Sequence, residues 1–193
     1  MNKKKFVAQF RVAPGAEVDL KKLARFQAPG HRVTNTRANG RSTGAGFDYL
    51  FVAVDDHSRL AFVGVYPDET KRSAADFLDR ALHAMCRMGT PVRRVLTDNG
   101  KCFASDMARA AYDRHDAQHR TTRPYRPRTN GKAERFIQTL LREWAYAATY
   151  DNADQRNSHL LPWLRWYNEE RPHASLNGLP PIHRLPNVLG NDI

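Results

Sequence analysis

The sequence predicts one mixed α/β domain, in which three antiparallel strands are followed by alternating helices and parallel strands. Two β-rich runs, YLFVAVDD at 49–56 and RLAFVGVY at 59–66, are separated by a short polar break at His57-Ser58 and are typical of a hairpin. Helical periodicity then appears, because apolar residues recur on one face of residues 73–88. A short apolar run at 93–98 restores the strand pattern, and helices and strands alternate from there on.

The elements before this alternation follow from local patterns. Residues 17–23 alternate loosely between apolar and polar side chains and predict a strand ahead of the hairpin. Residues 27–46 are rich in Gly, Thr, Asn and Arg and predict a loop. Ser73 followed by Asp76 resembles a capping box at the start of the first helix, and Gly89 is a typical stop.

The later elements alternate helix and strand patterns around one basic loop. They are a helix, a short strand, a Pro- and Arg-rich loop, a long helix and a last helix, at about 105–115, 118–122, 123–132, 130–148 and 154–168. Asn130 is expected to cap the long helix. We assign a basic, poorly ordered lead-in to 1–13, the core domain to 14–185 and a tail to 186–193.

Composition indicates a globular protein of a reducing compartment. Of the 193 residues, 41% are hydrophobic and 26% charged, which is typical of a folded domain. The two cysteines stand outside any CxxC or Cys/His cluster, so neither a disulfide framework nor a zinc finger is indicated. No signal peptide or membrane-spanning run is recognisable, and we expect a cytoplasmic protein.

The charge balance points to a polyanionic partner. Lys and Arg number 31 against 20 Asp and Glu, a formal net charge of +11. Seven of these cations lie within residues 120–142, beside a single acid. An excess of this kind says more about partners than about fold, and nucleic acid is the commonest polyanion.

Three carboxylates occupy positions that could bring them together. Asp98 ends a strand in the run VLTDNG, and active sites of open α/β sheets gather at the carboxyl ends of strands. Glu134 lies in the first turn of the long helix, at the rim of its apolar face. The 35 residues 99–133 separate it from Asp98. Asp19 lies in the first strand, with Val18 and Leu20 expected to point the other way.

Such a cluster would be strongly negative and would favour hard divalent cations. Mg²⁺ prefers carboxylate oxygens and completes its shell with water and substrate phosphates. Two such ions can activate the attacking oxygen and stabilise the leaving one in a phosphoryl displacement. Cations of the neighbouring loop and helix start would hold the phosphodiester backbone: Arg123, Arg126, Arg128, Lys132 and Arg135.

Each feature is also compatible with a purely structural role. Asp98-Asn99-Gly100 is a strong turn signal, Glu134 suits the positive end of a helix, and Asp19 could be a surface ion-pair partner. Asp55 is a rival first acid, but with Ser58 and Arg59 it is expected to hold the hairpin turn.

We expect no part in catalysis for the remaining polar residues. Asp48 and Asp56 are expected to be solvated, and His115 and His119 to be surface histidines, because a helix ends between them. Arg171-Pro172-His173 either faces DNA or braces the last helix.

Three longer motifs together are specific. They are VLTDNG at 95–100, RPYRPRTNGKAERFIQTLLREWAYA at 123–147 and WYNEERPHASLNGLPP at 166–181. With VDLKKLARF at 18–26 and YLFVAVDDHSRLAFVGVYPDE at 49–69, they resemble the catalytic core of the DDE transposase and retroviral-type integrase superfamily, above all the transposases of bacterial insertion sequences. The resemblance covers about residues 14–185.

The resemblance implies a ribonuclease H-like fold and a DNA strand-cleaving and strand-joining enzyme that uses Mg²⁺ or Mn²⁺, with two ions. It implies that Asp19, Asp98 and Glu134 are the catalytic, metal-binding acids. DNA contacts are expected from the basic loop and the helix start, namely Arg123, Tyr125, Arg126, Arg128, Asn130, Lys132 and Arg135. The expected partners are DNA and further copies of the chain on DNA in the nucleoid, with neither a membrane nor a small-molecule substrate.

Two departures from the family pattern motivate an alternative. Relatives carry an N-terminal helix-turn-helix region, whereas this chain begins shortly before its first strand, and PGAEVDLKKL is about two residues shorter than the usual first motif. The alternative is a truncated, inactive remnant that binds DNA or full-length subunits. A structure-specific nuclease of the same fold is a third hypothesis.

Overall fold

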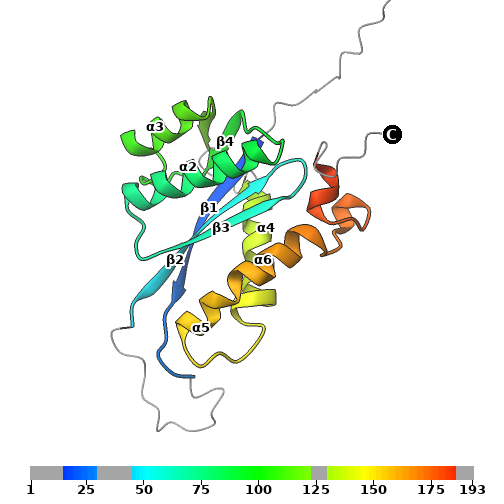
Figure 1. The fold of residues 1–193 in the computed structure, drawn as a ribbon. Helices are drawn as coiled ribbons and strands as arrows, with labels where there is room; N and C mark the ends of the chain where they lie inside the picture. The colour runs from blue at the N-terminus through cyan, green and yellow to red at the C-terminus, as the bar shows by residue number, and fades with distance from the viewer. Residues whose placement is uncertain (1–14, 30–44, 123–129, 186–193) are drawn as a thin grey trace, which may run out of the picture.

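One five-stranded mixed sheet organises the protein (Figure 1). The computed structural model describes residues 15–29, 45–122 and 130–185. The strands are β1 (Gly15–Ala24), β2 (Phe47–Asp55), β3 (Ala61–Tyr66), β4 (Arg94–Thr97) and β5 (Gln118–Thr121), in the spatial order β3-β2-β1-β4-β5. β1 pairs antiparallel with β2, and β2 with β3, whereas β1 and β4 and then β4 and β5 run parallel. The predicted mixed sheet is therefore confirmed.

Helices cover both faces of this sheet. Helices α2 (Lys71–Arg87) and α3 (Asp106–Arg114) pack on one face, and α4 (Gly131–Leu140) and α6 (Leu160–Glu169) on the other (Figure 1). Strand β2 shows why two cores exist, because its side chains alternate between the faces. Phe51 and Ala53 join the core beneath α2 and α3, whereas Leu50, Val52 and Val54 join the core beneath α4 and α6.

The expected helix starts and stops are only partly correct. The helix predicted at 73–88 begins at Lys71, and its N-cap is Thr70, whose hydroxyl accepts from the Ser73 amide at 3.3 Å. The Ser73 hydroxyl instead donates to Asp68 at 2.6 Å, so it is not the cap. Gly89 ends the helix as predicted, with a φ of +79° that suits glycine.

The two late helices are shorter than their apolar stripes predict. After Leu140, helix α4 continues as a π turn at Leu141–Ala145 and ends before residue 148. The Trp144 carbonyl is then capped by the Tyr150 hydroxyl at 2.7 Å. The last helix is divided into α5 (Ala153–Ser158) and α6. Pro162 explains the break, because it has no N–H to donate to the carbonyl four residues earlier.

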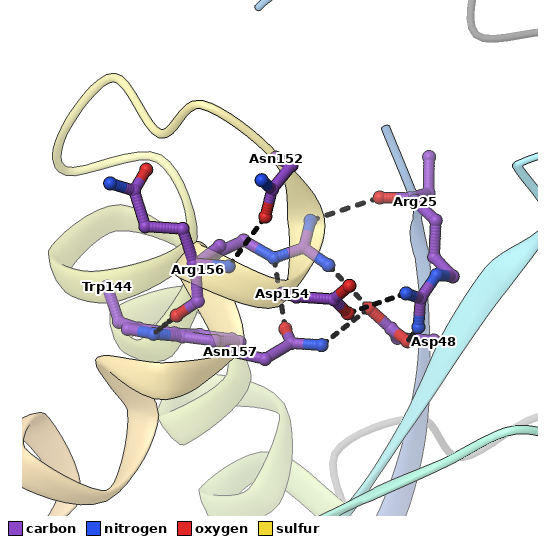
Figure 2. Close-up of polar contacts among 9 residues, drawn as sticks. Arg25, Asp48, Trp144, Asn152, Asp154, Arg156 and Asn157 are labelled. Atoms are coloured by element: carbon purple, nitrogen blue, oxygen red, sulfur yellow. Dashed lines mark hydrogen bonds and ion pairs between the residues drawn. The ribbon is translucent and has the colours of Figure 1, made fainter. Parts of the chain in front are cut away.

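A buried ion-pair network ties α5 to the start of β2 and corrects one expectation (Figure 2). Asp48, expected to be solvated, is only 2% exposed. Its carboxylate accepts from Arg156 at 2.7 Å, Asn157 at 2.9 Å and Arg25 at 2.9 Å. Arg156 is 1% exposed and also donates to the Ala24 carbonyl, so the network fastens the far end of the β1–β2 pair.

The remaining described chain consists of short turns. Two 3₁₀ turns, Ala174–Leu176 and Pro181–Arg184, follow α6. The lead-in 1–13, the tail 186–193 and most of the predicted loop at 27–46 lie outside the described residues. Within the described ranges, none of the helices combines the length and apolar character needed to cross a membrane.

Candidate active site

Strand register brings Asp19 and Asp98 to the same edge. In the parallel pair β1–β4, Val18 lies opposite Thr97, so Asp19 and Asp98 come next on neighbouring strands. Strands of one sheet lie about 4.8 Å apart, which makes these two residues close neighbours. Because Val18 packs toward α2 and α3, the alternating side chain of Asp19 projects toward the face that α4 covers.

The turn after β4 holds one oxygen of Asp98. The Gly100 amide donates to Asp98 Oδ1 at 2.9 Å, and the Thr97 hydroxyl donates to the Asp98 carbonyl at 2.7 Å. A Cβ on residue 100 would lie 2.8 Å from Asp98 Oδ1 and 3.3 Å from the Phe103 ring. A side chain at this position would therefore displace the Asp98 carboxylate, and Asp98 both belongs to a turn and presents its carboxylate.

A histidine supports this turn from β5, which sequence analysis missed. His119 Nε2 lies 2.8 Å from Thr97 Oγ1. Since the single Thr97 hydroxyl proton is donated to Asp98, His119 Nε2 is the donor in this contact. The ring stacks on Tyr112 at 4.6 Å, and burial lowers the pKa of His119. His119 is thus no plain surface histidine, and His115 likewise contacts Asp79, at 2.9 Å.

Glu134 is positioned by a helix start that a distant residue caps. Asn130 occupies the N-cap position but forms no capping bond with its side chain. The buried carboxylate of Glu17 caps instead, because its Oε2 accepts from the Lys132 amide at 2.7 Å and the Ala133 amide at 3.1 Å. The first turn of α4, and with it Glu134, is thereby fastened to β1.

The three predicted acids influence one another electrostatically. The pKa of Asp19 is raised to about 6, mainly by burial and in smaller part by the negative charges of Asp98 and Glu134. The Leu20 amide, which donates to Asp19 Oδ1 at 2.7 Å, opposes the rise. Asp98 and Glu134 therefore lie within electrostatic range of Asp19. In the part of the chain that the structure describes, no group of three or more His, Cys, Asp or Glu side chains is arranged to hold a metal ion.

Asp55, the alternative candidate for the first acid, forms hydrogen bonds within the hairpin turn. Asp55 is 1% exposed, and its Oδ2 accepts from the Ser58 amide at 2.6 Å, the Ser58 hydroxyl at 2.7 Å and the His57 amide at 3.1 Å. Arg59 adopts a φ of +66° and donates to the Asp56 carbonyl. These contacts agree with the structural role expected for Asp55, Ser58 and Arg59.

The expected DNA contacts are only partly within the described residues. Arg123, Tyr125, Arg126 and Arg128 lie outside them. Asn130 is 4% exposed, and its Nδ2 donates to the Val18 carbonyl at 3.4 Å, so its side chain faces β1.

The two remaining expected contacts differ in their surroundings. Lys132 Nζ lies 2.5 Å from Asp56 and 3.5 Å from Glu17, so Asp56 is not simply solvated as expected. Arg135 is exposed.

Family comparison agrees with this architecture. Two family models, each described as "Integrase core domain", match residues 32–127 and 115–181. The chain belongs to the integrase core domain family. Asp98 lies within the first match and Glu134 within the second, whereas Asp19 precedes both.

Relatives of this integrase core include proteins of bacterial insertion elements. The chain is 27% identical over 189 residues to the "Insertion element IS476 uncharacterized 39.2 kDa protein" of Xanthomonas euvesicatoria, a match covering 92% of the chain and 54% of that protein. It is 28% identical over 90 residues to transposase InsD of Escherichia coli, covering 47% of the chain and 30% of InsD. The chain thus spans about half the length of the IS476 protein and about a third of the length of InsD.

Solved structures confirm the ribonuclease H-like fold. The HTLV-2 integrase catalytic core domain in complex with magnesium superposes with a TM-score of 0.58 at 16% identity, covering 89% of this chain and 95% of that one. A chain of the simian T-cell lymphotropic virus intasome superposes with a TM-score of 0.63 at 21% identity, covering 90% and 55% respectively.

Proposed function

We propose that this integrase core cuts DNA strands and joins them to new DNA during transposition, with Asp19, Asp98 and Glu134 as its catalytic acids. The observation that carries the proposal is the register of β1 and β4, which makes Asp19 and Asp98 neighbours, with Glu134 of α4 near enough to act on the charge of Asp19. The family match and the insertion-element relatives support DNA as the substrate.

The chemistry of the three carboxylates, though not their arrangement in the described structure, suits a divalent metal. Three carboxylates that resist joint ionisation are relieved by a hard cation, and Mg²⁺ and Mn²⁺ prefer oxygen ligands. Asp19, Asp98 and Glu134 would hold the metal, for which we propose two ions, and the HTLV-2 relative was solved with magnesium. When bound, such ions stabilise charge on the attacking and leaving oxygens.

The residues of the chain then contribute position and charge. Gly100 and Thr97 fix the turn that presents Asp98, and Glu17 fixes the helix start that presents Glu134. Cations of residues 123–135 hold the phosphodiester backbone. A water oxygen attacks phosphorus as the bond to the 3′ oxygen breaks, and this oxygen leaves as a hydroxyl. The freed 3′ hydroxyl attacks a phosphodiester of the target DNA in the same way.

We further propose that several copies of the chain act together on DNA, in the cytoplasm at the nucleoid. The intasome relative supports an assembly on DNA. Neither a membrane nor a small-molecule substrate has a part in this reaction.

A matched pair of carboxylate variants tests the function. Glu134→Gln should abolish Mg²⁺-dependent nicking of a duplex and leave duplex binding intact, because it removes one negative charge and little volume. Glu169→Gln, at an exposed position of α6, should leave both unchanged. Full nicking by Glu134→Gln would exclude Glu134 from the site. Duplex binding without nicking by the wild type would favour the non-catalytic remnant.

A further inference from the structure

A basic groove lies between α4 and the segment after α6, and of its lining cations only Lys132 and Arg135 have a part in the proposed chemistry. Its volume is about 630 Å³. Five cations line it, and among its described lining residues there is no Asp or Glu. The five are Arg59, Lys132, Arg135, Arg142 and Arg171. Neutral hydrogen-bond donors, including Thr139 and Ser175, complete the wall.

Nearby acids compensate only part of this charge. Glu143, outside the lining, binds Arg171 through two bonds of 2.8 Å and Arg142 through one of 2.9 Å. Asp56 lies 2.5 Å and Glu17 3.5 Å from the Lys132 ammonium. Five cations less these three acids leave a net charge of +2, and no ion pair to Arg135 occurs within the described residues. The Glu143 bridge also holds the Arg171 guanidinium in one orientation, which favours binding of an anion.

The groove lies beside the three acids but on a different flank of α4. Arg135, Thr139 and Arg142 follow the i, i+4, i+7 spacing of one helical stripe. Glu134 precedes Arg135 by one residue and is therefore turned by about 100° around the helix axis. A ligand in the groove thus lies next to, and not at, the site of the acids.

The floor carries an unsatisfied polar group. His173 lines the groove, and its Nε2 is buried without a hydrogen-bond partner among the described residues. Burial lowers the pKa of His173, as does the charge of Arg171, so the ring is neutral near pH 7. Buried polar atoms are nearly always hydrogen-bonded, so an exception indicates a missing partner.

We propose that this groove binds backbone phosphates of a DNA segment beyond the phosphodiester that reacts at the acids, an inference that rests on the proposed function. The length of the stripe of side chains from Arg135 to Arg142 supports a nucleic acid backbone as the ligand. The stripe from Arg135 to Arg142 rises seven residues, roughly 10.5 Å. One DNA strand advances about 3.4 Å per phosphate along the duplex axis, so the stripe spans about three phosphates. Arg171 at the opposite wall contacts the same backbone.

Salt dependence of duplex binding tests the groove. Arg135→Gln with Arg142→Gln is compared with Arg80→Gln plus Arg109→Gln, exposed arginines of α2 and α3 on the opposite face of the sheet. Losing two phosphate contacts should lower the slope of log K against log salt by about 2. Affinity should fall at least tenfold at low salt, whereas the control pair should stay within about twofold. Because all four side chains are exposed, thermal midpoints should not change.

Cross-linking locates the ligand independently. Thr139→Cys, in a Cys86→Ser background, should form a disulfide with DNA that carries a backbone-tethered mixed disulfide, by thiol–disulfide exchange that releases the small leaving thiol. Equal losses in both arginine pairs, or absence of the cross-link while the duplex still binds, would overturn the groove and leave the proposed function standing. Failure of the wild type to bind any DNA would overturn both. Inhibition of cross-link formation by poly-glutamate as readily as by competing unmodified DNA would also overturn the assignment, because the groove would then accept any polyanion.

Discussion

Replacing Glu17 by alanine should loosen the helix start that presents Glu134. Glu17 reaches from β1 to accept from the Lys132 and Ala133 amides, 115 and 116 positions along the chain. Its side chain is 6% exposed and Ala133 is fully buried, so water cannot easily replace the carboxylate. The Glu17→Ala variant therefore leaves the buried Ala133 amide and the partly buried Lys132 amide without their acceptor.

The expected loss follows from these two contacts. An unsatisfied buried donor costs roughly 1–3 kcal/mol, and losing an anion at a helix N-terminus costs about 0.3–1 kcal/mol. Glu17→Ala also removes the cost of burying the Glu17 carboxylate, which offsets part of this loss. The net destabilisation is about 3 kcal/mol. For a protein of this size, 1 kcal/mol shifts the thermal midpoint by about 2–4 °C, so a fall of roughly 6–12 °C is expected.

Thermal unfolding and amide hydrogen exchange measure this effect. Exchange at Lys132 and Ala133 should accelerate in Glu17→Ala more than exchange elsewhere in α4. Asn130→Ala is the comparison variant, because Asn130 occupies the cap position without capping and loses only its long 3.4 Å contact to the Val18 carbonyl, at a cost of about 1 kcal/mol. If Asn130→Ala is the more damaging variant, or if Glu17→Ala retains native exchange at both amides, Glu17 is not the cap.

Three further predictions follow from buried polar groups. Asp48→Ala should destabilise the protein by about 3–5 kcal/mol in urea unfolding, because it strands the buried Arg156 charge; a loss below 1 kcal/mol would contradict the buried pair. The pKa of Asp19 is raised to about 6 from 3.8, so its ionised form weakens the metal-free fold above pH 6, and this penalty is lost as pH falls toward 4. Asp19→Asn should therefore increase the free energy of unfolding at pH 7.5 by about 1 kcal/mol after solvent screening, and so raise the thermal midpoint, but should have no such effect at pH 4. Equal midpoints of the variant and the wild type at pH 7.5 would refute this. Thr97→Val should weaken calorimetric Mn²⁺ binding several-fold while Thr97→Ser preserves it, because only the hydroxyl links His119 to Asp98; identical affinities would exclude that link.

Features set by neighbouring residues can be predicted from the sequence. The hairpin, the strand at 93–98 and the Gly89 helix stop all depend on local spacing, and all are present. The turn at Asp98 is predictable for the same reason, because Asn and Gly directly after an apolar run strongly favour a turn.

Features set by contacts across the fold cannot be predicted in this way. The sequence around Asp48 indicates a solvated carboxylate, because nothing near it reveals Arg156, 108 positions away. Asn130 has the position of a helix cap and capping is normally local, whereas Glu17 supplies the cap from another strand. The one sequence feature that could have indicated this cap is Glu17 itself, a glutamate in a strand expected to be buried, because a buried charge needs partners from elsewhere in the fold.

Mg²⁺- or Mn²⁺-dependent nicking and strand transfer on short duplexes, with wild type beside Asp98→Asn, tests the central claim most directly. The account predicts metal-dependent cutting and joining by the wild type, their loss in Asp98→Asn, and equal duplex binding by both. Undiminished cutting by Asp98→Asn would contradict the claim that the carboxylate at the end of β4 binds the catalytic metal.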